Sequence, residues 1–284
     1  MVGVRFPHPL LQKVSKEAFL FYKENGESYK GGLAMAEFLD CVMDIGEKML
    51  ICGAEVHRVE DSVERMCRAL GAKRVDVFII TSSMVVTLHM EDGTSHTQTR
   101  RITGSGTDLE KLHRLNHLSR RICSETMTAK QIMQEYESII NSKRYPFWLE
   151  CLCYALIAGS FTLFFGGTLK DAFVSPLIGV VISFVVLFAG KLSMNKIFEK
   201  FICSFVVTLL AFLFARFRWI QDVDKVIIGN IMTLIPGIGL TNGLRDLFGG
   251  DSIAGLLRTM EAALAALAIG AGYFLFVYMV GGVL

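Results

Sequence analysis

The chain has 284 residues, of which 52% are hydrophobic and 20% charged, and its formal net charge is only +2. So small a net charge gives no reason to expect nucleic-acid binding. The charges are unevenly placed: residues 1–145 carry 39 of the 56 Lys, Arg, Asp and Glu side chains. This division predicts two domains, a soluble one over residues 1–145 and a membrane domain over residues 146–284.

The first half alternates between helical and strand periodicity. Apolar residues at helical spacing predict five helices. Runs with period two predict three strands, and an Asp-Gly hairpin turn joins the second strand to the third. The predicted helices cover residues 10–25, 33–53, 55–70, 108–123 and 130–142, and the predicted strands residues 73–80, 84–90 and 95–100. We therefore expect an α+β domain with a three-stranded antiparallel meander.

One charged motif in this half has no clear role from its pattern alone. Residues 53–60 read GAEVHRVE and open the third predicted helix with Gly53, Glu55, Arg58 and Glu60. A solvated helix face, held by ion pairs between residues three and four apart, explains these charges as well as a functional site does. The half contains no recognisable nucleophile, metal or phosphate signature, so we expect no cofactor, no metal and no enzyme activity.

The second half contains five apolar runs that predict membrane spans. They cover residues 147–165, 172–189, 201–215, 226–240 and 253–283. The fourth run breaks at Pro236-Gly237 and leads into a glycine-rich segment with Asn242, Arg245 and Asp246. Interrupted helices with polar side chains at membrane depth are where transporters bind their substrates. The fold class expected is therefore an all-α polytopic membrane domain of five helices, one interrupted, behind a cytoplasmic α+β domain.

The amino terminus is expected to lie in the cytoplasm. The sequence predicts no secretory signal at the amino terminus, because the apolar stretch there is too short and is interrupted by two prolines. Lys and Arg are slightly more frequent in the loops that would then face inward. An odd number of spans would place the carboxyl terminus outside, as expected for one half of an inverted repeat.

Taken together, the GAEVHRVE motif, the meander, the five spans, the Pro236-Gly237 break and the residues Asn242, Arg245, Asp246 and Gly249-Gly250 resemble the bacterial threonine/serine exporter family. The resemblance covers nearly the whole chain. It implies a multi-pass protein of the bacterial inner membrane, surrounded by the lipid bilayer, that exports small polar metabolites. Some members fuse two five-span halves, whereas others pair such a half with a separate small five-span protein. The split branch includes a system implicated in succinate export.

Within that family the leading interpretation is a subunit of a secondary exporter for a small amino acid or a dicarboxylate. The partner would be a second five-span subunit, or another copy of this chain. The expected substrate-binding residues are Asn230, Pro236, Gly237, Gly239, Thr241, Asn242, Arg245, Asp246 and Arg258. Arg245 or Arg258 would bind a substrate carboxylate, and Glu261 or Glu150 would carry the coupled proton. Alternatively, Arg258 and Glu261, three residues apart, neutralise one another.

Two other function classes compete with export. In a membrane-anchored sensor, the soluble domain would bind a ligand and the spans would only anchor it, but an anchor needs no broken helix and no embedded acid. A membrane-embedded hydrolase needs a nucleophile–base pair or metal ligands within the spans. Residues 146–284 contain no histidine at all, which ranks the hydrolase last.

Overall fold

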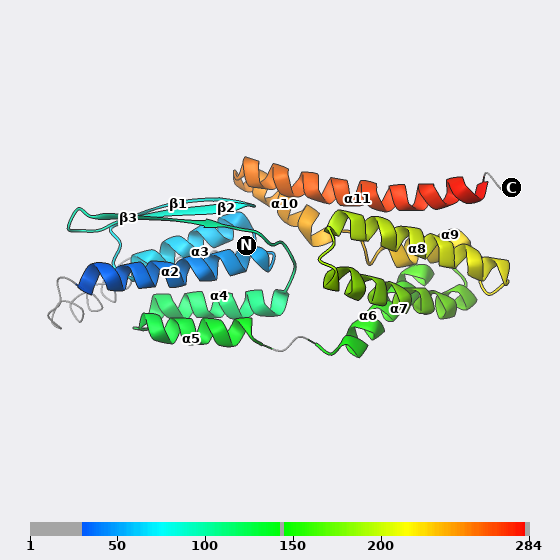
Figure 1. Ribbon diagram of the computed structural model, residues 1–284, viewed down its shortest axis with the longest axis horizontal. Coiled ribbons are helices and arrows are strands. Elements are labelled where there is room, and N and C mark those ends of the chain that lie inside the picture. Colours follow the sequence, from blue (N-terminus) through cyan, green and yellow to red (C-terminus); the bar gives the residue numbers. More distant parts are fainter. Residues whose placement is uncertain (1–29, 143–144, 282–284) are drawn as a thin grey trace. The chain divides into compact units, whose positions relative to one another are not determined.

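The structure is a computed structural model that describes residues 30–142 and 145–281 (Figure 1). The helix expected at residues 10–25 lies outside these residues. The chain forms two compact units. Unit 1 comprises the described part of Met1–Ser142 together with Thr241–Arg258, and unit 2 comprises Lys143–Leu240 and Thr259–Leu284 up to residue 281. The domain boundary expected near residue 145 stays a prediction, since unit 1 also takes in a segment from far down the chain.

Unit 1 has three layers: a sheet, a central pair of helices and an outer pair. The helices of the first half are α2 (Lys30–Ile51), α3 (Val56–Ala69), α4 (Leu109–Ser124) and α5 (Ala129–Ile140), and the strands are β1 (Arg74–Ile80), β2 (Ser83–His89) and β3 (Ser95–Arg101). α2 and α3 pack between the sheet and the pair α4–α5 (Figure 1). The α+β interpretation of this half is confirmed.

The sheet is the antiparallel meander that the alternating pattern predicts, in the order β1-β2-β3. Val77 of β1 lies opposite Val86, and Val86 lies opposite Gln98 of β3. Met84, Val86 and Leu88 alternate along β2 and are buried on the helix side. Because successive side chains point to opposite faces, this register places the apolar set of β2 against α2 and α3.

Unit 2 is a helical bundle. It contains α6 (Phe147–Phe164), α7 (Leu169–Lys191), α8 (Lys196–Arg216), α9 (Val223–Ile231) and the larger part of α11 (Ser252–Gly281). Among the described residues, four helices are long and apolar enough to cross a membrane: α6, α7, α8 and α11. Large apolar side chains such as Phe173, Phe188 and Leu267 are exposed along them, as expected for a surface in contact with lipid.

Small residues let the helices of unit 2 approach closely. A Cβ added at Gly229 of α9 would lie 2.3 Å from the Oγ1 of Thr162 in α6, and one at Gly179 of α7 would lie 2.7 Å from the carbonyl oxygen of Tyr154. Close backbone approach of this kind is how helices associate in lipid, where no hydrophobic force holds them together. Thr162 also donates a 2.7 Å hydrogen bond to Ser175 of α7, so a buried polar contact reinforces the packing.

The apolar run of residues 226–240 does not form one helix. α9 ends at Ile231, and α10 (Gly237–Gly249) begins directly after Pro236. Proline lacks the amide that would continue the helical ladder, and it favours the first turn of a new helix. Of the five spans expected, four are therefore present as long apolar helices, and the fifth would have to be built from α9 and α10.

Candidate functional site

The first turn of α3 is hydrogen-bonded by a residue 190 positions further along the chain. The residue before the helix, Glu55, makes no side-chain hydrogen bond to the first turn. The Val56 amide donates instead to Oδ1 of Asp246 in α10 at 3.1 Å. The first amides of a helix have no partner within the helix and attract negative charge. Asp246, whose side chain is only 1% exposed, therefore serves as a distant cap for α3.

Two further side chains bind the loop before α3 through its backbone. Arg258 of α11 donates to Oδ2 of Asp246 at 3.2 Å and to the Ala54 carbonyl at 2.8 Å. Asn242 of α10 donates to the Gly53 carbonyl at 2.9 Å. We call Asn242, Asp246 and Arg258, with the loop of residues 53–56, the cap cluster. It joins the α10–α11 segment to the first half of the chain within unit 1.

Gly53 is required by the geometry of this loop. Its φ is +95°, a conformation that costs residues with a Cβ roughly 1–2 kcal/mol. A Cβ there would also lie 3.0 Å from the Gly106 carbonyl oxygen, in the loop that leads into α4. The carbonyl that Asn242 binds is therefore held in place by a turn that favours glycine.

An ion pair at the edge of the cap cluster adds a second link between the same segments. Arg245 of α10 binds the Glu55 carboxylate, and Arg58 lies 3.9 Å from the other oxygen of Glu55. The Arg245 side chain is 60% exposed, whereas that of Glu55 is 14% exposed. The two arginines expected to bind a substrate carboxylate are thus both engaged by carboxylates of the protein itself.

Burial dominates the electrostatics of the Asp246 carboxyl. It raises the pKa of Asp246 above its usual value of 3.8, although the Arg258 guanidinium and the Val56 amide oppose the shift. Nearby Asp251 and Glu55 raise it further. Since the charged form is costly here, removing Arg258 would leave a buried carboxylate without compensation.

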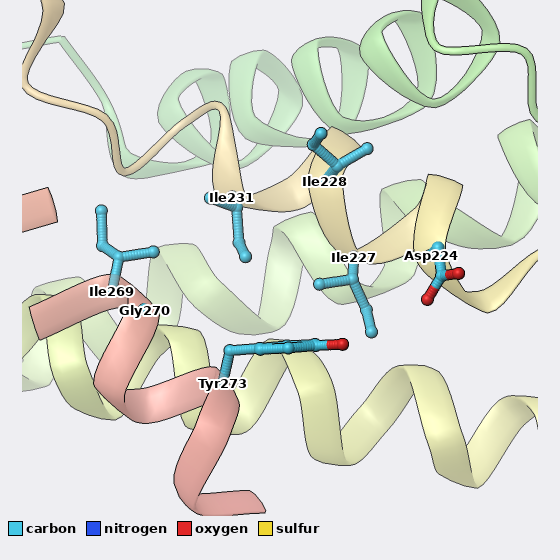
Figure 2. Close-up of a pocket in the computed structure, with 7 residues that line it drawn as sticks. All are labelled: Asp224, Ile227, Ile228, Ile231, Ile269, Gly270 and Tyr273. Carbon is cyan, nitrogen blue, oxygen red and sulfur yellow. The ribbon is translucent and has the colours of Figure 1, made fainter. Parts of the chain in front are cut away.

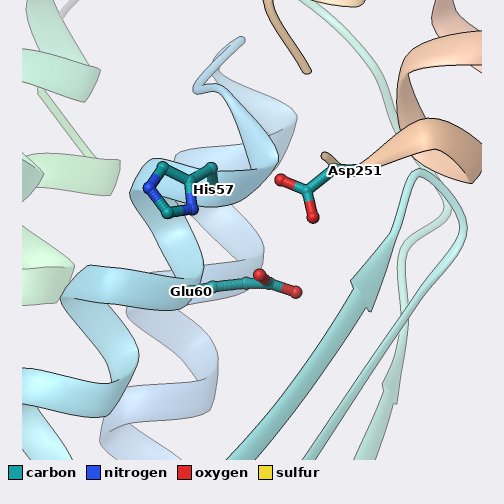
Figure 3. A group of neighbouring side chains, drawn as sticks. All are labelled: His57, Glu60 and Asp251. Atoms are coloured by element: carbon teal, nitrogen blue, oxygen red, sulfur yellow. The ribbon is translucent and has the colours of Figure 1, made fainter. Parts of the chain in front are cut away.

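A group of three titratable side chains lies beside the cap cluster (Figure 3). His57 and Glu60 of α3 and Asp251 of the α10–α11 turn each present a ligand atom within 4.8 Å of the others. One Glu60 oxygen accepts a 3.1 Å hydrogen bond from the Ile79 amide. The Oδ2 atom of Asp251 is buried and accepts no hydrogen bond from the described residues. Burial, followed by the neighbouring Asp251, raises the pKa of Glu60 above its ordinary 4.5.

The other residues expected at a substrate site are not members of the cap cluster. Asn230 is 1% exposed and donates to the Ser175 hydroxyl at 2.8 Å and to the Val226 carbonyl at 2.9 Å. The residues around the break are partly or fully exposed: Pro236, Gly237, Gly239 and Thr241. Both expected proton carriers are exposed, Glu150 in the first turn of α6 and Glu261 within α11. Their functional roles stay predictions.

Unit 2 also contains an apolar pocket of about 310 Å³ between α9 and α11 (Figure 2). The Tyr273 ring lies across it, with its hydroxyl on the side of Asp224. The lining is Asp224, Ile227, Ile228, Ile231, Ile269, Gly270 and Tyr273. None of the residues expected to bind substrate lines this pocket, and a single carboxylate among isoleucines offers little to orient a polar metabolite.

Comparison with known proteins now places the chain in a family. The family model described as "Putative threonine/serine exporter" matches residues 40–280. The chain belongs to this family. It is therefore a multi-pass membrane protein of an exporter family, a transport protein and not an enzyme.

Relatives from bacteria and yeasts support this placement. "Probable succinate transporter subunit YjjP" of Klebsiella aerogenes is 27% identical over 230 residues, which cover 81% of this chain and 88% of the relative. The protein of the same name from Escherichia coli is 24% identical, over 78% of this chain and 86% of its own length. "Pheromone-regulated membrane protein 10" of Kluyveromyces lactis is 24% identical over 81% of this chain but only 25% of its own length. No solved structure matches the chain.

Sequence reasoning singled out most members of the cap cluster but not their contacts. Gly53 and Glu55 belong to the GAEVHRVE motif, for which the pattern predicts no role, and Asn242, Asp246 and Arg258 belong to the expected substrate site at membrane depth. The structure brings the two groups together. The alternative pairing of Arg258 with Glu261 does not occur among the described contacts, because Arg258 binds Asp246 instead. His57 and Asp251 were not expected to be functional, since their segments meet only in the folded chain.

Proposed function

We propose that this chain is one subunit of a two-protein secondary exporter for small carboxylate-bearing metabolites, such as succinate, serine or threonine. The observation that carries the proposal is the match, over most of both chains, to proteins named as succinate transporter subunits. A subunit by definition works with another chain, and a second five-span membrane protein suits the odd number of spans expected here. The bacterial inner membrane is the proposed location.

The fifth membrane crossing is proposed to be the interrupted one, formed by α9, residues 232–236 and the start of α10. At 1.5 Å per residue, α9 alone is roughly 14 Å long and cannot cross about 30 Å of hydrocarbon. Non-helical backbone is tolerated at that depth only where the protein satisfies it. Two contacts do so here: the Lys200 ammonium binds the Leu234 carbonyl, and the Thr233 hydroxyl donates to the Asn230 carbonyl at 2.7 Å.

The proposed partner subunit is expected to cover α11. Glu261 is exposed inside this membrane-crossing helix, where a carboxylate facing lipid would be costly. The small residue Ala266 is exposed on the same helix, and a Cβ at Gly270 would meet nothing within 4 Å. A second helix could approach closely at Ala266 and Gly270, which share a face because they are four residues apart. Glu261 lies on another side of α11, so its carboxylate would need a polar group of the partner at that side.

For substrate binding we favour Arg245 over Arg258. Both terminal nitrogens of Arg258 are already used inside the cap cluster. Arg245 is more exposed and is held by a single carboxylate, that of Glu55. A substrate carboxylate could exchange with Glu55 at this guanidinium, which binds carboxylates in a bidentate geometry. The cap cluster links the first half of the chain to the α10–α11 segment, which carries Arg245, and this link supports an exporter over the sensor alternative.

The test is efflux from cells or proteoliposomes that are preloaded with labelled succinate, serine or threonine. We expect efflux of at least one substrate when the chain is combined with a five-span protein of the same family, and little without it. Arg245→Gln should lower efflux, whereas Arg65→Gln, which removes the exposed pair with Asp61, should not. Full transport by the purified chain alone would disprove the need for a partner, and absence of efflux for all three substrates would disprove the substrate class.

Membrane topology is tested separately. A periplasm-active reporter fused after Leu284 should be active and a cytoplasm-active one inactive, if the chain crosses five times from a cytoplasmic amino terminus. The reverse result would indicate an even number of crossings, and α9 with α10 would then be a re-entrant segment.

A further inference from the structure

His57, Glu60 and Asp251 form a compact set of metal-ligand side chains in unit 1 (Figure 3). His57 and Glu60 share one face of α3 because they lie three residues apart. Asp251 arrives from the turn before α11, where Gly250 at φ +104° reverses the chain. All three side chains point toward one another, and their ligand atoms lie within 4.8 Å.

The charges around this set are not balanced. Four carboxylates lie close together here, and two of them have arginine partners: Glu55 pairs with Arg245, and Asp246 with Arg258. Glu60 and Asp251 have no Lys or Arg partner among the described contacts. A pair of converging carboxylates without a cation is costly when partly buried, and the usual compensation is a counter-ion or a proton.

One carboxylate oxygen of Asp251 lacks a hydrogen-bond partner among the described residues. Asp251 precedes α11, where an aspartate side chain normally accepts a hydrogen bond from the amides of the first turn. Its Oδ2 is instead buried without any hydrogen-bond partner in the described chain, and the carboxylate faces His57 and Glu60. Buried polar atoms without a partner are rare, and an ion is one of the few things that satisfies them.

We propose that His57, Glu60 and Asp251 bind a divalent transition-metal ion, with Zn²⁺ as the best match. One imidazole and two carboxylates are common ligands of Zn²⁺, whereas Mg²⁺ and Ca²⁺ prefer oxygen ligands alone. Zn²⁺ bonds of about 2.0–2.2 Å hold ligand atoms roughly 3.3–3.6 Å apart, so the three side chains would draw closer together around the ion. His57 is exposed, so the ion enters from solution and water completes its coordination.

The bound ion would fasten α3 to the α10–α11 turn, next to the cap cluster. It would add a metal-dependent link between two segments that the cap cluster and the Arg245–Glu55 ion pair already join. This inference does not rest on the proposed function, because metal binding is measured without transport.

The experiment uses the full chain purified in detergent, stripped with EDTA and titrated with ZnCl₂. We expect one Zn²⁺ per chain and a rise in melting temperature, and no comparable rise with MgCl₂. His57→Ala should weaken Zn²⁺ binding by roughly tenfold or more, since each ligand contributes strongly to affinity. His57 is exposed, so this variant should fold. Asp251→Asn should weaken Zn²⁺ binding too, but raise the melting temperature in EDTA by removing a repelling charge.

The matched control is the double variant His113→Ala/His117→Ala on α4. These histidines lie four residues apart on a helix and offer an alternative, adventitious metal site. Zn²⁺ binding that survives in this control and is lost in His57→Ala supports the proposal. Loss of binding in the control, equal binding in His57→Ala, or no saturable binding to the wild-type chain would each overturn it.

Discussion

Replacing Asp246 by alanine tests whether the cap cluster holds unit 1 together. The substitution removes the acceptor of the Val56 amide and leaves the Arg258 guanidinium, whose side chain is 13% exposed, without its carboxylate. The loss of a buried partner is costly because the remaining charge stays desolvated. The effect should therefore greatly exceed that of an exposed ion pair, even though the contact lengths are similar.

The magnitude follows from the burial of this pair. Breaking a buried ion pair by removing one partner costs about 3–5 kcal/mol, because the remaining charge is left buried without compensation. For a unit of this size, each kcal/mol lowers the melting temperature by about 2–4 °C, so a fall of roughly 6–20 °C is expected. The control Asp61→Ala removes an exposed pair with Arg65 on the same helix and should cost at most about 1 kcal/mol.

The assay is thermal unfolding of the purified chain, followed by circular dichroism and by limited proteolysis between α2 and α3. Asp246→Asn should fall between the wild type and Asp246→Ala, because its side-chain oxygen can still accept from Val56. Combining Asp246→Ala with Arg258→Met should recover part of the loss, since no buried charge then lacks a partner. Equal melting temperatures for Asp246→Ala and Asp61→Ala would refute the reasoning.

Three further predictions follow from single positions. Gly53→Ala should destabilise the protein by more than Gly93→Ala, because both have positive φ but only Gly53 also has a carbonyl 3.0 Å from its added Cβ; thermal unfolding compares them. Gly229→Ala should disrupt the packing of α6 against α9 and reduce the yield of monodisperse protein on size-exclusion chromatography, whereas Gly270→Ala, with open space around it, should not. Glu60→Gln should raise the melting temperature in EDTA at pH 7. The raised pKa of Glu60 means that ionisation of its carboxyl destabilises the folded state. The gain in melting temperature from Glu60→Gln should therefore shrink as the pH falls to 4.5 and below, where the Glu60 carboxyl becomes protonated in the folded and the unfolded chain. A gain that does not change with pH would contradict this.

Much of the fold could be predicted because local periodicity determines it. The alternation of Met84, Val86 and Leu88 predicted β2, and the spacing of Val56, Val59 and Val63 predicted α3; both elements are confirmed. The membrane helices were predicted from apolar length alone, which requires no knowledge of their neighbours. These signals act within one element, and so they are visible in the sequence.

The cap cluster could not be predicted in this way. Asp246 is 190 residues from Val56, and Arg258 is 204 residues from Ala54, so no periodicity connects them. The polar residues of α10 lie next to an apolar run, which suggested membrane depth, whereas the structure gives them backbone partners in the loop before α3. One local sign was present: Glu55 is a weak choice before a helix, where Ser, Thr, Asp or Asn is usual, and this hinted that α3 is capped from elsewhere.

The distant cap on α3 has a consequence for the biosynthesis of the protein. The ribosome makes Val56 about 190 residues before Asp246, which at roughly 5–20 residues per second is a delay of about 10–40 s. During that interval the amino-terminal half can form its helices and sheet, but the Val56 amide at the start of α3 has only water in place of the Asp246 carboxylate. The capping of this helix waits until α10 and the start of α11 have been synthesised. Unit 1 is therefore among the first parts of the chain to be translated and among the last to be finished.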